Sequence, residues 1–169
     1  MRRFIFLIAI AVGISALLRM YVFEAASVAS GSMEPTLFIG GHYWINRMVY
    51  RFREPRRGEI ISFVSPVDHH SKFIKRVIAI PGDEVELRSK QVVINHAAID
   101  EPYAVHSRPG SRLVGDDLGP LKVPERCVFV LGDNRDESFD SSIWKDSETG
   151  QPIYFLSFDQ IRGRLIQIP

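Results

Sequence analysis

The sequence predicts a membrane-tethered, mostly antiparallel β domain. After Glu24 the chain consists of short runs rich in β-branched and aromatic residues, which are separated by clusters of Pro, Gly, Asp and Asn. In this part the apolar residues do not keep helical spacing over several turns, and only residues 33–37 and 157–161 are predicted to form single helical turns. The first 23 residues are instead almost entirely apolar.

The composition is that of one globular domain. The chain has 169 residues, of which 46% are hydrophobic and 24% charged, so it is long enough to build its own core. A net charge of +1 gives no reason to expect a nucleic-acid partner. The single cysteine, Cys127, excludes an intrachain disulfide. The spacing of histidines, cysteines and carboxylates is not that of a metal site, and no cofactor is expected.

Residues 4–23 are predicted to be a transmembrane anchor helix behind a cytoplasmic N-terminus of residues 1–3. The stretch from Phe4 to Leu18 carries no charge and would be about 22 Å long as a helix, whereas the hydrocarbon core of a bilayer is roughly 30 Å thick. The span becomes long enough if Arg19 extends its guanidinium to the interface.

A cleavable secretory signal is the alternative for this segment, because residues 27–29, Ser-Val-Ala, offer the small side chains of a cleavage site. Arg2 and Arg3 favour a cytoplasmic N-terminus in both cases. We therefore expect the β domain on the outer face of the inner or plasma membrane, with the lipid bilayer as a partner.

The β domain is predicted to have one core in two parts, residues 24–95 and 125–169. Residues 96–124 between them are richer in Pro, Gly and charge and are expected to be an inserted loop or small hairpin. The basic run at residues 51–59 is expected on a solvated face or strand edge, and contact with anionic lipid is the alternative. The expected strands are residues 42–50, 59–65, 72–80, 83–88, 91–96, 126–132 and 162–168.

A candidate nucleophile lies in ASGSMEPTL, residues 29–37. Its small residues place Ser32 on a tight turn, where a hydroxyl can attack a substrate if a base takes its proton. Histidine is the usual base, but none of the five histidines lies in a motif of catalytic shape.

Lys75, in FIKRVIAIPGD, is the other candidate base. The segment is predicted to be a buried strand, and burial disfavours the ammonium form. Lowering the lysine pKa from roughly 10.4 by about two to three pH units corresponds to roughly 3–4 kcal/mol, which lies within the range known for buried lysines. The alternative is that Lys75 points to solvent. Because neighbouring side chains in a strand face opposite sides, only one of Lys75 and Arg76 is expected to be buried.

A third polar segment, GDNRDESFDSS at residues 132–142, follows an apolar strand and is too long for a simple hairpin turn. Its hydroxyl and carboxylate groups are suited to orienting a neighbouring amine. An ordinary loop held by its own side-chain hydrogen bonds is the alternative.

These segments, in this order behind an apolar N-terminus, resemble the bacterial type I signal peptidases, the serine-lysine leader peptidases. RMYVFEAASVASGSMEPTL is similar to the nucleophile box, KFIKRVIAIPGDEVEL to the lysine box, and VPERCVFVLGDNRDESFDSS to the glycine-aspartate-asparagine box. The first twenty residues and residues 144–156 have no clear counterpart. The resemblance implies a serine endopeptidase with a mostly β catalytic core and a smaller insertion.

The resemblance also implies a role for each matching residue. Ser32 would be the nucleophile and Lys75 the general base, and the Ser30 hydroxyl would join the Ser32 backbone N–H in the oxyanion hole. Ser138 would orient the Lys75 amine, and Asp140 would support the site. The structural part of the third box would be Gly132, Asp133, Asn134, Arg135 and Asp136.

The implied substrates are exported preproteins, cut after small residues, with no metal or nucleic acid involved. We expect the extended cleavage region to add as a strand beside residues 27–30 and 73–75. Its small side chains would enter shallow pockets lined by Val28, Ile74 and Val130.

The chain departs from the family pattern at three places. Ala29 replaces the proline that often precedes the Ser-Gly-Ser, which is a mild change. Ser142 replaces the arginine that usually pairs with Asp140, so Asp140 is expected to use Arg135 or another partner. Residues 144–156 are longer and more polar than in the family and are expected to form a surface hairpin.

Two other functions stay open at this point. The chain is alternatively a specialised processing peptidase of a secretion or conjugation system, or an inactive membrane-tethered binding module. The presence of Ser30, Ser32, Lys75 and Ser138 favours an active enzyme.

Overall fold

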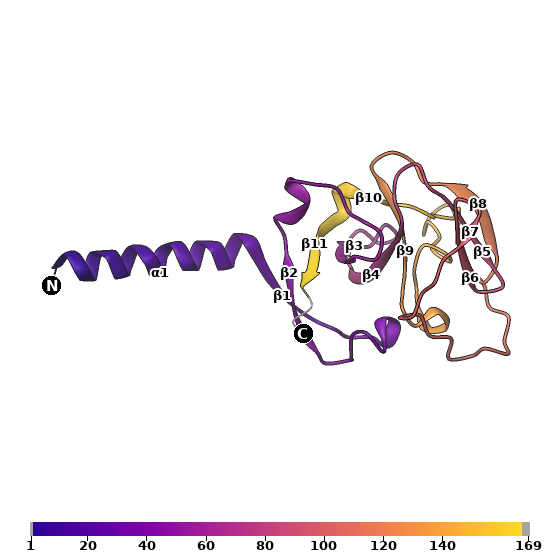
Figure 1. The fold of residues 1–169 in the computed structure, drawn as a ribbon, viewed down its shortest axis with the longest axis horizontal. Coiled ribbons are helices and arrows are strands. Elements are labelled where there is room, and N and C mark those ends of the chain that lie inside the picture. The colour runs from indigo at the N-terminus through magenta and orange to yellow at the C-terminus, as the bar shows by residue number, and fades with distance from the viewer. Residues whose placement is uncertain (1, 167–169) are drawn as a thin grey trace.

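The computed structural model describes the backbone of residues 2–166 and the side chains of residues 3–15 and 21–166. A 21-residue helix, α1 (Arg2–Val22), leads into a domain built of antiparallel strands. The helix projects from one end of that domain (Figure 1). The expectation of a mostly β, antiparallel fold is confirmed.

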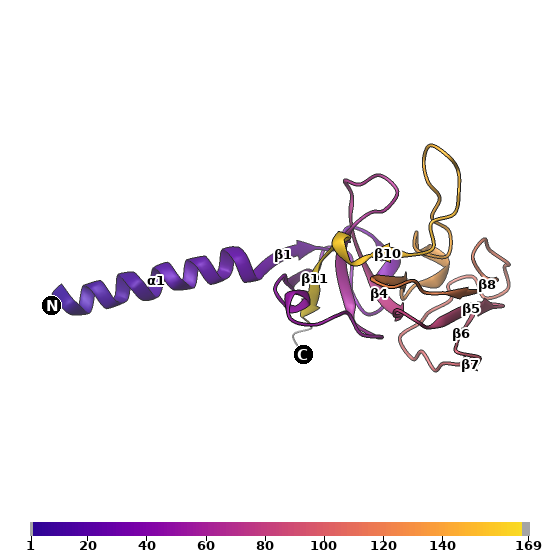
Figure 2. The same cartoon turned by 90° about the horizontal axis from the view of Figure 1, so that it is seen from above.

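Most strands belong to a large sheet of seven, in the order β1-β2-β11-β3-β4-β9-β10. A smaller sheet of four has the order β7-β6-β5-β8 and lies at the end of the domain opposite α1 (Figures 1 and 2). The strands of the large sheet are β1 (Phe23–Ser27), β2 (His42–Asn46), β3 (Ile60–Val64), β4 (Lys72–Ala79), β9 (Cys127–Leu131), β10 (Leu156–Ser157) and β11 (Ile161–Ile166), and those of the small sheet are β5 (Glu84–Arg88), β6 (Gln91–Ile94), β7 (Ala97–Ala98) and β8 (Leu118–Lys122).

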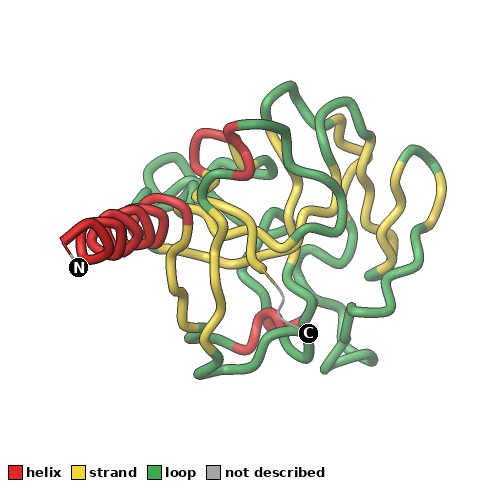
Figure 3. The backbone as a smooth tube through the Cα atoms, turned by 60° about the vertical axis from the view of Figure 1, so that its left-hand side comes forward, coloured by secondary structure: helices red, strands yellow, loops and turns green. Residues whose placement is uncertain are grey.

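Within residues 2–166, four short 3-10 turns lie in the connections between strands. Figure 3 shows short helical turns in red outside α1. Two of them overlap the single turns predicted after residues 33 and 157. They are η1 (Gly31–Met33), η2 (Val49–Arg51), η3 (Arg135–Glu137) and η4 (Phe158–Gln160).

Each of the predicted strands coincides with an observed one. The last predicted strand, residues 162–168, is described only as far as Ile166. The insertion expected at residues 96–124 begins earlier, because β5 and β6 already pair into the small sheet. The expectation failed at this boundary because β5 and β6 look like core strands in sequence.

The helix predicted for the N-terminus is present as α1, but its proposed span is not supported. Within residues 2–166, no helix combines the length and the apolar character needed to cross a membrane, in contrast to the anchor predicted over residues 4–23. The side chain of Arg19, on which the predicted length depended, lies outside the described side chains.

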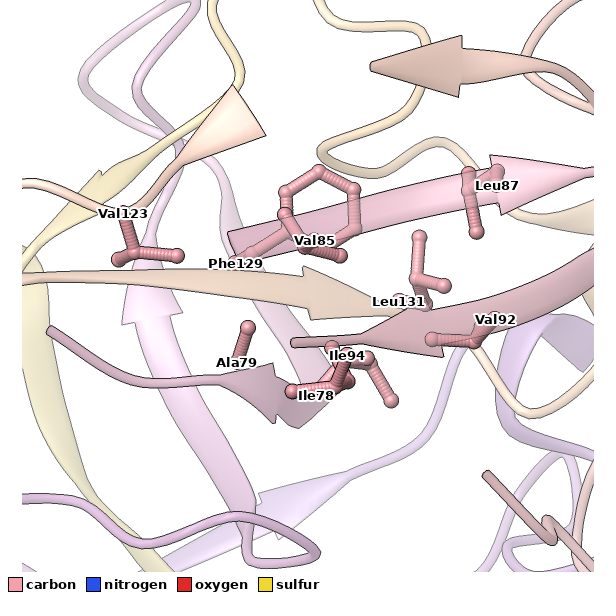
Figure 4. Packing of buried hydrophobic residues seen from close by; sticks show 9 residues of the cluster. All are labelled: Ile78, Ala79, Val85, Leu87, Val92, Ile94, Val123, Phe129 and Leu131. Atoms are coloured by element: carbon pink, nitrogen blue, oxygen red, sulfur yellow. The ribbon is translucent and has the colours of Figure 1, made fainter. Parts of the chain in front are cut away.

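Three apolar clusters form the core, and one of them joins the two sheets. In that cluster Ile78, Phe129 and Leu131 of the large sheet pack against Val85 and Ile94 of the small sheet (Figure 4). Strand alternation explains the division, because the side chains of β9 at residues 128 and 130 enter the second cluster and those at residues 129 and 131 the first. The third cluster lies among β2, β3, β11 and the turn at η1.

Candidate active site

The Lys75 amine lies 2.5 Å from the Ser32 hydroxyl, although the two residues are 43 positions apart. Ser32 is part of η1 and is 7% exposed, and Lys75 is part of β4 and is 3% exposed. The contact therefore has the distance that direct proton transfer requires. The structure brings together the two residues that the resemblance assigned to nucleophile and base.

Burial changes the acidity of Lys75. Removal from water lowers the pKa of its amine from 10.5 to about 8, while the negative charges of Asp140 and Asp133 act in the opposite direction. The neutral amine that a general base requires is thus accessible near neutral pH.

The turn that carries Ser32 is held by the loop that follows β9. The Asn134 backbone N–H donates to the Ser32 carbonyl at 3.1 Å. Thr36, just beyond the turn, donates to Asp133 at 2.5 Å. Both contacts connect the nucleophile segment to the third box, which explains why the two sequence motifs occur together.

Ser30 lies beside the nucleophile. Its hydroxyl is 3.3 Å from the Ser32 hydroxyl, and its extended backbone leads directly into η1. This position is compatible with the oxyanion role that the resemblance implies, which stays a prediction.

Ser138 lies beside Gly132, close to the Ser32 carbonyl oxygen. Its hydroxyl is buried and has no hydrogen-bond partner among the described residues. A Cβ added to Gly132 would collide with this hydroxyl and with the Ser32 carbonyl oxygen. Gly132 therefore allows the loop and the nucleophile turn to approach closely. The proposed contact from Ser138 to the Lys75 amine is not among the hydrogen bonds of this structure.

Lys75 and its neighbour Arg76 are both buried, at 3% and 8% exposure. The expectation that only one of them is buried was wrong, because both faces of β4 are covered. Arg76 is accommodated by Asp133, which accepts from its Nε at 2.8 Å and its Nη2 at 2.5 Å. The sequence analysis missed Arg76 and Thr36 as supporting residues. Alternation along β4 shows that Arg76 faces away from Lys75 but does not reveal its partner.

Asp140 has local partners in place of an arginine. It accepts from the Ser142 hydroxyl at 2.7 Å, the Ser142 N–H at 3.1 Å and the Gly132 N–H at 3.0 Å. Arg135, the partner suggested from sequence, instead pairs with Glu101 at 2.6 Å. The residue that departs from the family pattern thus supplies the missing hydrogen bonds itself.

Asp136 connects the loop at residues 132–142, here called the catalytic loop, to the insertion rather than to the active site. It accepts from the Lys90 amine at 2.7 Å and from the Arg108 N–H at 2.6 Å. These bonds and the lysine charge hold the pKa of the Asp136 carboxyl below its usual range despite burial, which acts to raise it. Asp136 is therefore a structural residue of this loop.

The three predicted pocket residues do not share one pocket. Val28 lies in the third apolar cluster, against which Ile74 packs, whereas Val130 is fully buried in the second cluster. Val130 of β9 pairs with Val77 of β4, so their side chains share a face. Ile74 lies an odd number of positions before Val77 in β4 and therefore faces the other side. Val28 and Ile74 therefore pack together and apart from Val130, and their role in a substrate pocket stays a prediction.

The segment at residues 144–156 packs beneath the catalytic loop. The buried Trp144 contacts Phe63 and Phe139 edge to face, with ring centroids 5.7 and 6.5 Å apart. A bridge between Lys145 and Pro152 closes a short exposed turn.

Within the described side chains, no group of three or more His, Cys, Asp or Glu residues is arranged to hold a metal ion.

Comparisons with known proteins agree with this geometry. Residues 1–168 match the family "Signal peptidase, peptidase S26". A probable signal peptidase I-2 of Synechocystis is 42% identical over 133 residues, which are 75% of this chain and 58% of that relative. Signal peptidase I P of Bacillus subtilis subsp. natto is 37% identical over 138 residues, covering 79% of this chain and 74% of the relative.

A solved structure supports the same assignment. The crystal structure of a signal peptidase I from Enterococcus faecalis matches with a TM-score of 0.52 and 28% sequence identity, covering 68% of this chain and 98% of the other. The chain therefore belongs to the signal peptidase family, peptidase S26.

Proposed function

We propose that this chain is a signal peptidase I that removes signal peptides from exported preproteins, with Ser32 as nucleophile and Lys75 as general base. The observation that carries the proposal is the 2.5 Å contact between the Lys75 amine and the Ser32 hydroxyl in a buried site. Its support is that burial lowers the lysine pKa to about 8. Membership of the signal peptidase family supports the reaction class.

In the proposed reaction, the neutral Lys75 amine accepts the Ser32 proton while the hydroxyl oxygen attacks the scissile carbonyl. As the carbon–nitrogen bond breaks, the lysinium donates that proton to the leaving amine. A water molecule then gives a proton to Lys75 as its oxygen attacks the acyl carbon. The lysinium returns that proton to the Ser32 oxygen as the ester bond breaks, which restores the Ser32 hydroxyl and the neutral amine. Ser30 and the Ser32 N–H would stabilise the oxyanion, and removing one such donor typically costs about 3–4 kcal/mol.

The proposed substrate path lies between β1 and β4. Residues 72–75 of β4 pair with β3, whereas pairing with β9 begins only at Arg76, so this edge has no second strand in the described part of the chain. β1 is one of the two edge strands of the large sheet. An ion pair of 2.6 Å between Glu24 and Lys72 connects the two strands and supports their proximity. An extended peptide is suited to the space between two such edges.

Val28 and Ile74 would select the small side chains of the cleavage site. Both pack in the third apolar cluster, next to the nucleophile turn through Met33. The outer face of the membrane is the proposed setting, because exported preproteins are the proposed substrates and Arg2 and Arg3 favour a cytoplasmic N-terminus.

Cleavage of a preprotein in detergent, followed by N-terminal sequencing of the product, tests this function. Wild type and Lys122→Ala, which removes an exposed lysine of the small sheet, are expected to cut after a small residue. Ser32→Ala and Lys75→Ala are expected to be inactive. Cleavage by Lys75→Ala would contradict the mechanism, and no cleavage by folded wild type would favour the inactive binding module.

A further inference from the structure

In the basic run at residues 51–59, some arginines form ion pairs within the protein and others do not. Arg53 contacts Glu59 at 2.5 Å, and Arg57 pairs with Asp83. Arg51 is exposed and has no ion-pair partner among the described side chains. The run is therefore not a uniformly basic strip. Arg51 and Arg56 are its exposed arginines without an ion pair among the described side chains, and of these two Arg51 lines the groove described next.

Arg51 borders a groove whose charged lining is entirely basic. The groove has a volume of about 440 Å³, and its lining includes Arg47, Arg51 and Arg162 but no carboxylate. Arg162 is also exposed and without an ion-pair partner in the described part of the chain, and Arg47 approaches Glu24 only at 3.8 Å. Arg162 joins Arg47 and Arg51 from a distant part of the sequence, and three arginines in one groove favour an anionic occupant. A guanidinium pairs readily with phosphate.

A neighbouring hollow of about 340 Å³ shares four lining residues with this groove, which are Tyr50, Arg51, Phe158 and Ile161. Its lining adds the carboxylates of Glu54 and Asp159, and Asp159 pairs with Arg126 at 2.8 Å. These carboxylates offset part of the arginine charge of the hollow. The anion therefore belongs to the all-arginine groove.

The same groove lies where an exposed apolar helix ends. Phe4, Phe6 and Val12 of α1 are 70%, 65% and 63% exposed. At the other end of α1, Tyr21 is 63% exposed and lines the groove together with the three arginines. Figure 2 shows the exposed length of the helix leading directly to the domain at β1. Exposed apolar surface of this extent indicates contact with a membrane or another protein.

We propose that this groove binds the phosphate group of an anionic phospholipid. Such a ligand matches both features, because its phosphate is anionic and its acyl chains are apolar like the neighbouring helix. Arg51 and Arg162 hold the phosphate, and the acyl chains lie along α1. The groove shares no residue with the Ser32–Lys75 site, so the inference does not depend on the proposed peptidase mechanism.

Flotation of the full chain with phosphatidylcholine vesicles, with and without phosphatidylglycerol, tests the proposal at low ionic strength. Wild type is expected to prefer the vesicles that contain phosphatidylglycerol. Arg51→Gln/Arg162→Gln is expected to reduce this preference by about tenfold or more, since each basic residue at an anionic surface contributes about a fivefold gain in binding. The matched control is Arg88→Gln/Arg112→Gln, which removes the same charge from exposed positions around the small sheet and is expected to keep the preference.

If the two double variants lose the preference for phosphatidylglycerol vesicles equally, net charge alone explains the preference, and the proposed binding site is overturned. Absence of any preference in wild type would overturn it as well. Protection of wild type by inorganic phosphate in thermal unfolding, without a vesicle preference, would identify a site for free phosphate and overturn the lipid assignment. Cleavage of a short soluble peptide is expected to be unchanged in both double variants, which separates this proposal from the peptidase proposal.

Discussion

Arg76 on β4 and Asp133 in the catalytic loop form a two-bond ion pair, with Nε and Nη2 of the arginine 2.8 and 2.5 Å from the two carboxylate oxygens. Asp133 is fully buried and also accepts from Thr36 beside the nucleophile turn. One carboxylate thus connects the strand that carries Lys75, the loop after β9 and the segment that carries Ser32.

We expect Asp133→Asn to destabilise the fold strongly. The change leaves the buried Arg76 guanidinium without a counter-charge, and breaking a buried pair in this way typically costs about 3–5 kcal/mol. Asp117→Asn is the matched control, since Asp117 pairs with Arg112 in solvent and its loss is expected to cost less than about 1 kcal/mol. Urea unfolding of both variants measures the difference, and equal losses would contradict the assigned role.

The activity is expected to rise with pH through the pKa of Lys75. The base must be neutral to accept the Ser32 proton, and burial lowers the pKa of its amine to about 8. Measurement of kcat/KM on a short peptide should therefore give an ascending limb with an apparent pKa near that value. A profile that does not change across this range would be incompatible with Lys75 as the base.

Lys75 is also expected to make stability depend on pH. Its pKa is about 8 in the folded protein and 10.5 in an unfolded chain, so the unfolded state binds the proton more tightly. The penalty is fully present below the folded value and disappears as pH rises through 10.5. Lys75→Met should raise the unfolding free energy by up to about 3 kcal/mol at neutral pH and by much less at high pH. The same gain at both pH values would show that the buried charge is not its cause.

Gly132→Ala is expected to damage the site and the fold together. The added methyl group would overlap the Ser138 hydroxyl and the Ser32 carbonyl oxygen, and overpacking of this kind costs about 1–3 kcal/mol. Gly110→Ala is the control, because a Cβ there meets nothing within 4 Å. The midpoint temperature of thermal unfolding and kcat should both fall for Gly132→Ala and stay unchanged for Gly110→Ala. Normal kcat in folded Gly132→Ala would mean that the close approach is not needed for catalysis.

Ile74→Ala is expected to broaden the residues accepted at the cleavage site. Ile74 packs in the same apolar cluster as Val28, so its truncation enlarges the proposed pocket. Val130→Ala truncates a side chain of the other cluster and should lower stability without altering specificity. Cleavage of a set of peptides that differ at the residue before the cut distinguishes the two. Unchanged specificity in Ile74→Ala would remove this residue from the pocket.

The sequence predicted the elements of this fold better than their partners. The strands were identifiable because β-branched runs between turn residues are a local signal, and β4 itself was found in this way. The burial of Arg76 beside Lys75 was not predicted, since it depends on Asp133, 57 positions away. Alternation along a strand indicates which side chains share a face, but it does not reveal what covers that face.

The catalytic candidates were predicted from three motifs whose order matched a known family. The contacts that support these residues were not predicted. Asp140 accepts a hydrogen bond from Ser142, two residues further on, and Arg135 forms an ion pair with Glu101. Val130 was grouped with Val28 and Ile74 although the sheet separates them. The error at Val130 arises because the assignment of a side chain to a face requires the register of neighbouring strands. Asp140 and Arg135 lie in a loop, where strand alternation gives no guide to their partners.

The chain enters the small sheet and leaves it at neighbouring points beside the large sheet. The Gly82 N–H donates to the Val123 carbonyl at 3.0 Å, and the Val123 N–H donates to the Asp83 carbonyl at 2.8 Å. Evolution can therefore lengthen or shorten the chain between these residues without changing the register of β4 and β9. Complete deletion is a different matter, because it would expose the apolar side chains of Ile78 and Phe129 that the small sheet now covers. A relative with a much shorter insertion should carry polar residues at these two positions.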